Sequence, residues 1–332
     1  MIRLPFLLGS ALFALLSTLG SGSALAQSET ANEKSTAASY ATPENPMTVV
    51  LDARQAYRGL MFAHITLPAK PGPFTLVYPK WIPGEHGPTG PLRGISVLRI
   101  STSGHALEWR RDDVDMYAFH VDVPAGSNSL TVDYNVLVNS EDDVMATKNV
   151  AIINWNRDLL YQAGTASDHV FVKPSIVLPA GWGYGTALTG AQQNGDRVDF
   201  AQTTLETLID SPLDMGRYYK HIIQWESGDA SAQVDIFADR PQALEIPPKL
   251  LTAYKNYVPE TLALFGGRHW QHYHALLTLS DEIGSQGIEH HQSSDDRETD
   301  DFFTDPTSQL SSGDLLTHEF THSWNGKYRR PA

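Results

Sequence analysis

Hydrophobic positions in the first two thirds of the chain follow the pattern of β-strands. Short runs of alternating or β-branched residues recur between Gly, Pro and Asn, as is typical of an antiparallel sandwich. The predicted strands are residues 48–51, 74–78, 95–100, 118–123, 130–138, 151–154, 171–178 and 234–238. Prolines crowd residues 68–91, so we expect edge strands and loops there rather than a helix or a central strand. We therefore predict an antiparallel β-sandwich-like domain over residues 46–239.

The spacing of apolar residues changes near residue 239. Over residues 243–265 they recur at steps of three and four, which predicts a helix that ends at a pair of glycines. Residues 272–279 have the pattern of a strand, and residues 280–294 are interrupted by Gly and Ser. Residues 295–301 are rich in carboxylates and are predicted to form an acidic loop. We predict a mixed α/β region over residues 240–332, which makes the whole chain an α+β multidomain protein.

The first residues of the chain have the pattern of an export signal. Arg3 precedes a mostly apolar stretch, and Ala24 and Ala26 fit the small-residue cleavage pattern. A membrane-anchoring helix is disfavoured because Gly and Ser interrupt a run shorter than the ~20 apolar residues that a span needs. We predict a cleaved signal peptide at residues 1–26 and a flexible lead-in at residues 27–45. The mature protein is then expected in the periplasm or outside the cell, without stable insertion into a membrane.

Composition and charge exclude several classes of function. The 332 residues contain 24 Lys and Arg and 38 Asp and Glu, which gives a formal net charge of −14. General binding of nucleic acid is disfavoured, because neutralising phosphates needs clustered cations. The absence of cysteine excludes disulfides, thiolate zinc sites and cysteine nucleophiles. The chain also lacks a G-x-S-x-G element and a glycine-rich phosphate loop, and nothing in it indicates an oligomeric state.

The motif that carries chemistry lies near the carboxyl end, where residues 318–322 read H-E-F-T-H. On a helix, His318 and His322 lie on one face about one turn apart, so both imidazoles can bind one Zn²⁺ ion. Glu319 can then act as a general base and acid, taking a proton from water and delivering it to a leaving amine. Polar residues before the motif and Gly326 after it favour a helix here. The alternative is a chance match among ordinary surface histidines.

Residues 318–325, with the basic residues that follow, resemble the signature of the glycyl aminopeptidase family of zinc metallopeptidases, which are of the gluzincin type. Residues 287–290 look like that family's G-x-E-H segment, and residues 81–84 match less specifically. The resemblance implies an N-terminal β domain, a thermolysin-like α/β catalytic domain that begins within this chain, a PDZ domain and peptide substrates. It also implies that Glu289, on an edge strand, binds the free α-amino group of the substrate. A carboxylate partner offsets the desolvation of such an ammonium group.

The family pattern also contains residues without a counterpart here. Its third zinc ligand is a glutamate on the following helix, and this chain stops ten residues after His322 with no acidic residue beyond Glu319. The tyrosine that stabilises the oxyanion lies further on in the family. His290, His291 and Asp314 are candidate substitutes for the third ligand, by proximity in sequence alone. We expect a truncated copy of a longer peptidase, and a weakly active or inactive isolated polypeptide.

Several alternatives remain open. The chain can be a non-catalytic exported β-sandwich binding protein with a relic motif, or an endopeptidase, which would not need Glu289 to cleave amino-blocked peptides. His272 and His274 share one face of a predicted strand and can form a metal pair, although an ordinary strand is favoured. The acidic residues 141–143 lack the spacing of a calcium loop, so a solvated loop is favoured. A packed turn is favoured over a binding loop at residues 81–86.

Overall fold

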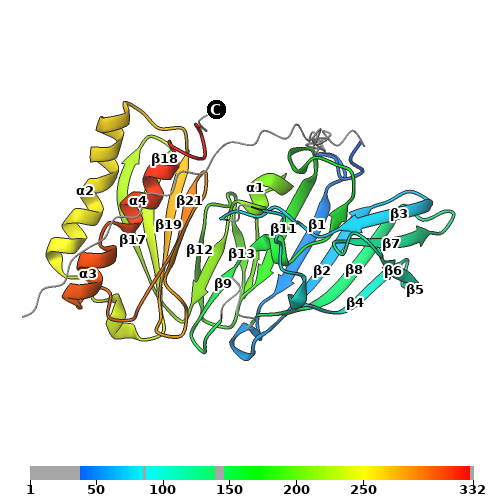
Figure 1. The fold of residues 1–332 in the computed structure, drawn as a ribbon, viewed down its shortest axis with the longest axis horizontal. Helices are drawn as coiled ribbons and strands as arrows, with labels where there is room; N and C mark the ends of the chain where they lie inside the picture. The colour runs from blue at the N-terminus through cyan, green and yellow to red at the C-terminus, as the bar shows by residue number, and fades with distance from the viewer. Residues whose placement is uncertain (1–37, 85–86, 139–145, 330–332) are drawn as a thin grey trace, which may run out of the picture. The chain divides into compact units, whose positions relative to one another are not determined.

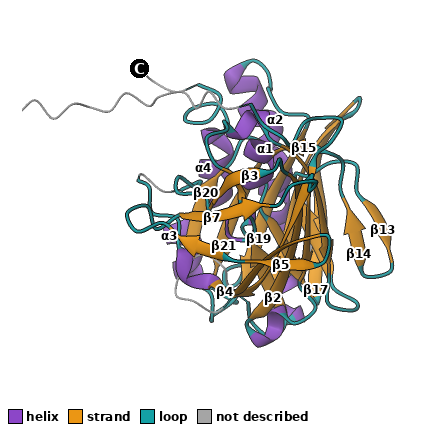
Figure 2. Ribbon diagram, turned by 90° about the vertical axis from the view of Figure 1, so that its right-hand side faces the viewer, coloured by secondary structure: helices purple, strands orange, loops and turns teal. Residues whose placement is uncertain are grey.

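The computed structural model describes residues 38–84, 87–138 and 146–329. Strands form most of the regular structure in this part of the chain, and they are arranged in four sheets (Figure 2). The predicted signal peptide, the first part of the lead-in, the acidic residues 141–143 and residues 85–86 lie outside the described residues. Among the described helices, none combines the length and the apolar character that crossing a membrane requires.

The largest sheet has the strand order β13-β14-β11-β1-β2-β8-β4-β5, with β15 also paired to β11. Figure 1 labels β11, β1, β2, β8 and β4 of this sheet. Its strands are β1 (Met47–Asp52), β2 (Leu60–Pro68), β4 (Ile95–Thr102), β5 (His105–Leu107), β8 (Ser129–Leu137), β11 (Phe171–Val177), β13 (Gln192–Asn194), β14 (Arg197–Asp199) and β15 (Thr203–Thr204). β1 and β8 bury alternate residues, as expected when one face of a sheet covers a core. The pair β1–β11 is parallel, whereas the other pairs of this sheet are antiparallel.

Two smaller sheets complete the N-terminal region. One has the order β10-β3-β7-β6 and the other β12-β16-β9. Their strands are β3 (Gly72–Val77), β6 (Trp109–Arg111), β7 (Ala118–Val123), β9 (Val150–Ile153), β10 (Tyr161–Gln162), β12 (Gly183–Thr186) and β16 (Leu213–Gly216). Ile65 and Val132 of the large sheet share one hydrophobic core with Leu76 and Val121 of the four-stranded sheet. The region is thus β-rich with facing sheets, in agreement with the sandwich-like prediction.

Two details of this region differ from the sequence predictions. Tyr40 and Ala41, which the flexible lead-in includes, are packed on the core. Ala41 is buried, and the Tyr40 ring lies 6.1 Å from that of Phe74. The prediction of a flexible segment is therefore wrong at these positions. It relied on the absence of a hydrophobic periodicity, and a single aromatic residue such as Tyr40 does not create one. The prediction of edge strands is wrong for β3, which lies between β10 and β7. Pro73 is tolerated in this strand because it pairs only with β7, since β10 reaches no further than Leu76.

The C-terminal region is built on a sheet with the order β17-β18-β19-β21-β20. Its strands are β17 (Tyr218–Ser227), β18 (Ala230–Ala238), β19 (His272–Leu279), β20 (Gln286–Glu289) and β21 (Ser293–Glu298). β18, β19 and β21 are parallel, and the edge strands β17 and β20 are antiparallel to their neighbours. β17 and β18 precede residue 239, so the predicted domain boundary falls within this sheet.

Helices α2 (Pro248–Phe265), α3 (Pro306–Ser312) and α4 (Leu315–His322) lie beside this sheet on one side (Figure 1). Tyr257 of α2, Tyr273 of β19 and Phe320 of α4 belong to the core between these helices and the sheet. α2 begins at Pro248 and ends at Gly266, whose φ of 76° is favourable only for glycine. Pro259 lies inside α2 without ending it. The helix predicted from the apolar spacing is confirmed, with a later start.

Residues 293–298 form a buried strand, so the acidic loop predicted from residue 295 onward is wrong. Every residue of β21 is buried. Asp295 accepts hydrogen bonds from Nε and Nη2 of Arg297, at 3.0 and 2.5 Å. Ser294 donates to Asp296 at 2.6 Å, and burial raises the pKa of the Asp296 carboxyl well above its ordinary value. Charges that are paired or neutralised by a proton can be buried, which a composition-based prediction does not register.

Candidate active site

Helix α4 carries the H-E-x-x-H motif. Asp314 is one of the polar residues that precede the helix, but its side chain makes no capping hydrogen bond. The Nε2 atoms of His318 and His322 lie 3.1 Å apart. Two nitrogens bound to one tetrahedral zinc ion at ~2.0–2.1 Å are about 3.3 Å apart, so this spacing suits two zinc ligands. Nδ1 of His322 lies 3.0 Å from the carbonyl oxygen of Asn325, a contact that makes Nδ1 the donor and leaves Nε2 free to bind a metal.

Two imidazoles are fewer protein ligands than a catalytic zinc site normally uses. Catalytic zinc normally has three protein ligands. Within residues 38–84, 87–138 and 146–329, no group of three or more His, Asp or Glu side chains is arranged to hold a metal ion. The candidate substitutes His290, His291 and Asp314 therefore do not complete the set in the described structure.

Glu319 lies on the buried side of α4, against strand β20. A Cβ atom built on Gly287 would lie 2.3 Å from Oε1 of Glu319, so only glycine allows this carboxylate to approach the strand. The Glu319 residue is 6% exposed. Burial raises the pKa of the Glu319 carboxyl, while His318 and His322 oppose this rise. A rise in the pKa is the direction that suits a carboxyl acting as general base and acid.

Glu289 lies on the edge strand β20, as the resemblance implied, and lines a cleft of about 560 Å³. Trp81 and Asp210 from the N-terminal region and Lys327 from beyond α4 also line this cleft. Of the packed turn predicted at residues 81–86, the described part packs at Gly84, where a Cβ would lie 3.2 Å from the side chain of Ile288. The same turn presents Trp81, 64% exposed, to the cleft. His318 and His322 do not line the cleft themselves. Gly287 does line it, and this residue is in close contact with the Glu319 carboxylate.

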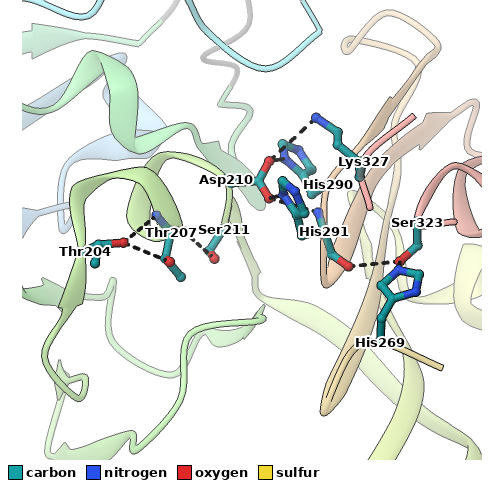
Figure 3. Close-up of polar contacts among 9 residues, drawn as sticks. All are labelled: Thr204, Thr207, Asp210, Ser211, His269, His290, His291, Ser323 and Lys327. Atoms are coloured by element: carbon teal, nitrogen blue, oxygen red, sulfur yellow. Dashed lines mark hydrogen bonds and ion pairs between the residues drawn. The ribbon is translucent and has the colours of Figure 1, made fainter. Parts of the chain in front are cut away.

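Asp210 is a site residue that the sequence analysis missed. It follows helix α1 (Leu205–Ile209) and accepts hydrogen bonds from Nδ1 of His290 at 3.1 Å and Nδ1 of His291 at 2.6 Å (Figure 3). Nζ of Lys327 lies 3.7 Å from the same carboxylate. Burial raises the pKa of Asp210, but the two histidine hydrogen bonds and Lys327 outweigh it and hold the pKa well below its usual range. No spacing in the sequence relates residue 210 to residue 290, so only the fold reveals this contact.

The other histidine pair does not form a joint site. Nδ1 of His272 lies 3.1 Å from Oγ of Ser231, whereas Nδ1 of His274 lies 2.6 Å from Oδ2 of Asp235. Asp235 also receives Nδ1 of His221 at 2.5 Å. Burial raises the pKa of Asp235, but the two histidine hydrogen bonds bring it down to about 2. His272 and His274 both lie on β19, but their side chains contact different partners, as expected of an ordinary strand.

Comparisons with known proteins cover both regions. The model of the peptidase M61 N-terminal domain matches residues 48–217, and that of the M61 glycyl aminopeptidase matches residues 312–332. No match was found among curated protein sequences.

Solved structures show the same fold. One is an aminopeptidase N family protein from Idiomarina loihiensis, with a TM-score of 0.72 and 17% identity over 86% of this chain and 49% of that protein. Another is an M1 zinc metallopeptidase from Deinococcus radiodurans, with a TM-score of 0.50 and 12% identity over 84% of this chain and 63% of that protein. The chain thus spans about half of the first protein and less than two thirds of the second. Because the N-terminal family model covers just over half of the chain and the second model covers the H-E-x-x-H helix, the chain belongs to the M61 glycyl aminopeptidase family.

Proposed function

We propose that this chain provides the metal-binding and amine-binding parts of a zinc-dependent aminopeptidase, which releases the N-terminal residue of a peptide by hydrolysis. His318 and His322 hold the zinc ion through Nε2. A bound zinc ion supplies a Lewis acid that lowers the pKa of water towards ~7. With two protein ligands among the described residues, we expect this chain alone to bind zinc weakly and to turn over slowly. The predicted signal sequence at residues 1–26 supports export to the periplasm or the outside of the cell.

The packing of Glu319 against Gly287 is the observation that carries the proposal. It brings the general base next to the strand on which Glu289 follows two residues later. Glu289 is close enough for its charge to contribute to the raised pKa of Glu319. In this arrangement Glu319 accepts the proton of the attacking water and delivers it to the leaving amine.

Glu289 gives the proposed reaction its exopeptidase character. Its carboxylate lines the cleft, where it can pair with the ammonium group at the start of a peptide. An internal segment of a peptide has no such group, and its neutral amide would leave the carboxylate without a charged partner. The arrangement therefore favours peptides with a free N-terminus as substrates.

Zinc stoichiometry and hydrolysis of aminoacyl-anilides test the proposal. We expect zinc binding that is lost in His318→Ala and His322→Ala, and hydrolysis that falls at least 100-fold in Glu319→Gln while zinc binding is retained. A chain that binds no zinc and hydrolyses nothing would favour the non-catalytic binding protein. Glu289→Ala distinguishes the endopeptidase, which would still cleave amino-blocked peptides at an unchanged rate.

A further inference from the structure

Both polar groups of the His291 main chain are engaged by side chains from other elements. Its N–H donates to Oδ2 of Asp210 at 2.9 Å, and its carbonyl oxygen accepts from Oγ of Ser323 at 3.0 Å (Figure 3). Asp210 belongs to the N-terminal region, and Ser323 is the residue directly after His322 of the H-E-x-x-H motif. The main chain two residues beyond Glu289 is therefore held from two sides.

The contact at Ser323 has a defined direction. Its single hydroxyl proton is donated to the carbonyl of His291, so its oxygen must accept from Nε2 of His269, which lies 2.9 Å away. His269 is therefore the tautomer with its proton on Nε2. Burial lowers the pKa of His269, which favours this neutral form. Ser323 is fully buried, so water does not compete for these hydrogen bonds.

The contact at Asp210 is equally specific. Oδ1 of Asp210 accepts a hydrogen bond from Nδ1 of His290, which is 2% exposed. Oδ2 accepts two hydrogen bonds from His291, one from Nδ1 of its side chain and one from its main-chain N–H. The lowered pKa of Asp210 keeps it a carboxylate throughout the neutral range. A charged acceptor makes these hydrogen bonds stronger than neutral ones, so the histidine pair has one favoured position.

We propose that Asp210 and Ser323 are positioning residues that clamp His291 and so fix Glu289 relative to helix α4. An aminopeptidase must hold its amine anchor at a set distance from the bond that is cleaved, and a displacement of about 1 Å is enough to impair a site. The clamp joins the strand that carries the anchor to the helix that carries the motif. This inference rests on the proposed function, because it gives Asp210 and Ser323 a role in recognising the free amine.

The test measures binding rather than turnover. In a zinc-loaded Glu319→Gln background, calorimetry compares glycyl-glycinamide with its N-acetyl derivative, which lacks the ammonium group. We expect Asp210→Asn and Ser323→Ala each to reduce the preference for the free amine about 3- to 10-fold, the usual worth of one hydrogen bond. Affinity for the acetylated peptide should change little, whereas general loosening of the structure would lower both affinities together.

Two further variants calibrate the result. Glu289→Gln should abolish the preference altogether. Ser211→Ala removes a hydrogen bond of 2.7 Å to the carbonyl of Thr207, next to Asp210 but outside the clamp, and should leave the preference unchanged. If Asp210→Asn does not fold, Ser323→Ala decides the matter alone.

The outcomes separate the two proposals. A preference that persists in both clamp variants, yet disappears in Glu289→Gln, overturns the clamp and leaves the proposed function standing. A loss in only one of two folded clamp variants overturns the two-sided form of the inference. If the parent background shows no preference, the amine anchor itself fails, and the clamp fails with it.

Discussion

Two arginine–aspartate pairs of nearly the same local geometry lie in opposite surroundings in the two regions. In the N-terminal region, Arg54 binds Asp52 through Nε at 2.9 Å and Nη2 at 2.5 Å, and its side chain is 61% exposed. In the C-terminal sheet, Arg297 binds Asp295 through Nε at 3.0 Å and Nη2 at 2.5 Å, and both side chains are fully buried. In both pairs the aspartate precedes the arginine by two residues and the contact is the same. Burial, however, decides how much the loss of one partner changes the free energy of unfolding.

The contrast extends to the strands around these pairs. β8 alternates buried and half-buried positions along most of its length, and its buried positions are apolar. β21 reads S-S-D-D-R-E and is buried throughout. The first kind of strand is stabilised by removing apolar area from water, and the second depends on each polar group finding its partner. We therefore expect the C-terminal sheet to be the less tolerant of substitution.

Arg297→Met is expected to have the largest effect. It leaves the buried Asp295 carboxylate without its partner, which should lower the free energy of unfolding by ~3–5 kcal/mol. Arg54→Met is the matched control, and its free energy of unfolding should change little because Asp52 is 26% exposed and water can solvate its carboxylate. Urea unfolding of both variants makes the measurement. Equal falls in the free energy of unfolding of the two variants would show that burial does not determine the contribution of such a pair.

Asp158→Asn tests a buried carboxyl that, unlike Asp295, accepts no hydrogen bond from an arginine in the described structure. Neither of its oxygens has a hydrogen-bond partner among the described residues, and burial raises its pKa to about 8. The folded protein therefore keeps a proton that the unfolded chain releases above its ordinary pKa. Stability from this group is complete below about pH 4 and is lost as the pH rises towards 8, by up to about 1.4 kcal/mol per pH unit. Unfolding measured across this range should show a shallower fall in the variant, and parallel curves would contradict the raised pKa.

Sequence reasoning recovered what depends on period and local motif. Most of the sandwich strands, helix α2, strand β19 and the shared face of His318 and His322 follow from residue spacing. Strand β2 is not among the predicted strands, and residues 234–238 belong to the C-terminal sheet rather than to the sandwich. It failed where a polar segment is buried by specific pairing, as in β21, and where a contact joins distant segments, as at Asp210. Such contacts leave no periodic signal, because their free energy comes from partners that the fold alone brings together.

Gly287→Ala is expected to be costly through overpacking. Its Cβ would meet Oε1 of Glu319 at 2.3 Å, so the helix or the strand must shift, at a cost of ~1–3 kcal/mol. Gly284→Ala, in the loop just before β20, is the control, since a Cβ there meets nothing within 4 Å. Thermal unfolding and the free-amine preference should both fall in the first variant and stay unchanged in the second. A Gly287→Ala protein with parental stability and preference would show that Glu319 does not need this close approach.

Ile65→Val in the sandwich is expected to have the smallest effect. Ile65 is fully buried in the core shared by the two facing sheets, and the change removes one methylene without exposing a polar group. The free energy of unfolding should fall by only ~0.5–1.5 kcal/mol, because neighbouring apolar side chains can relax into the space. Urea unfolding beside Arg297→Met gives the direct comparison of the two regions. If Ile65→Val lowered the free energy of unfolding as much as Arg297→Met, the comparison would fail. An apolar core and a buried charge pair would then tolerate substitution equally.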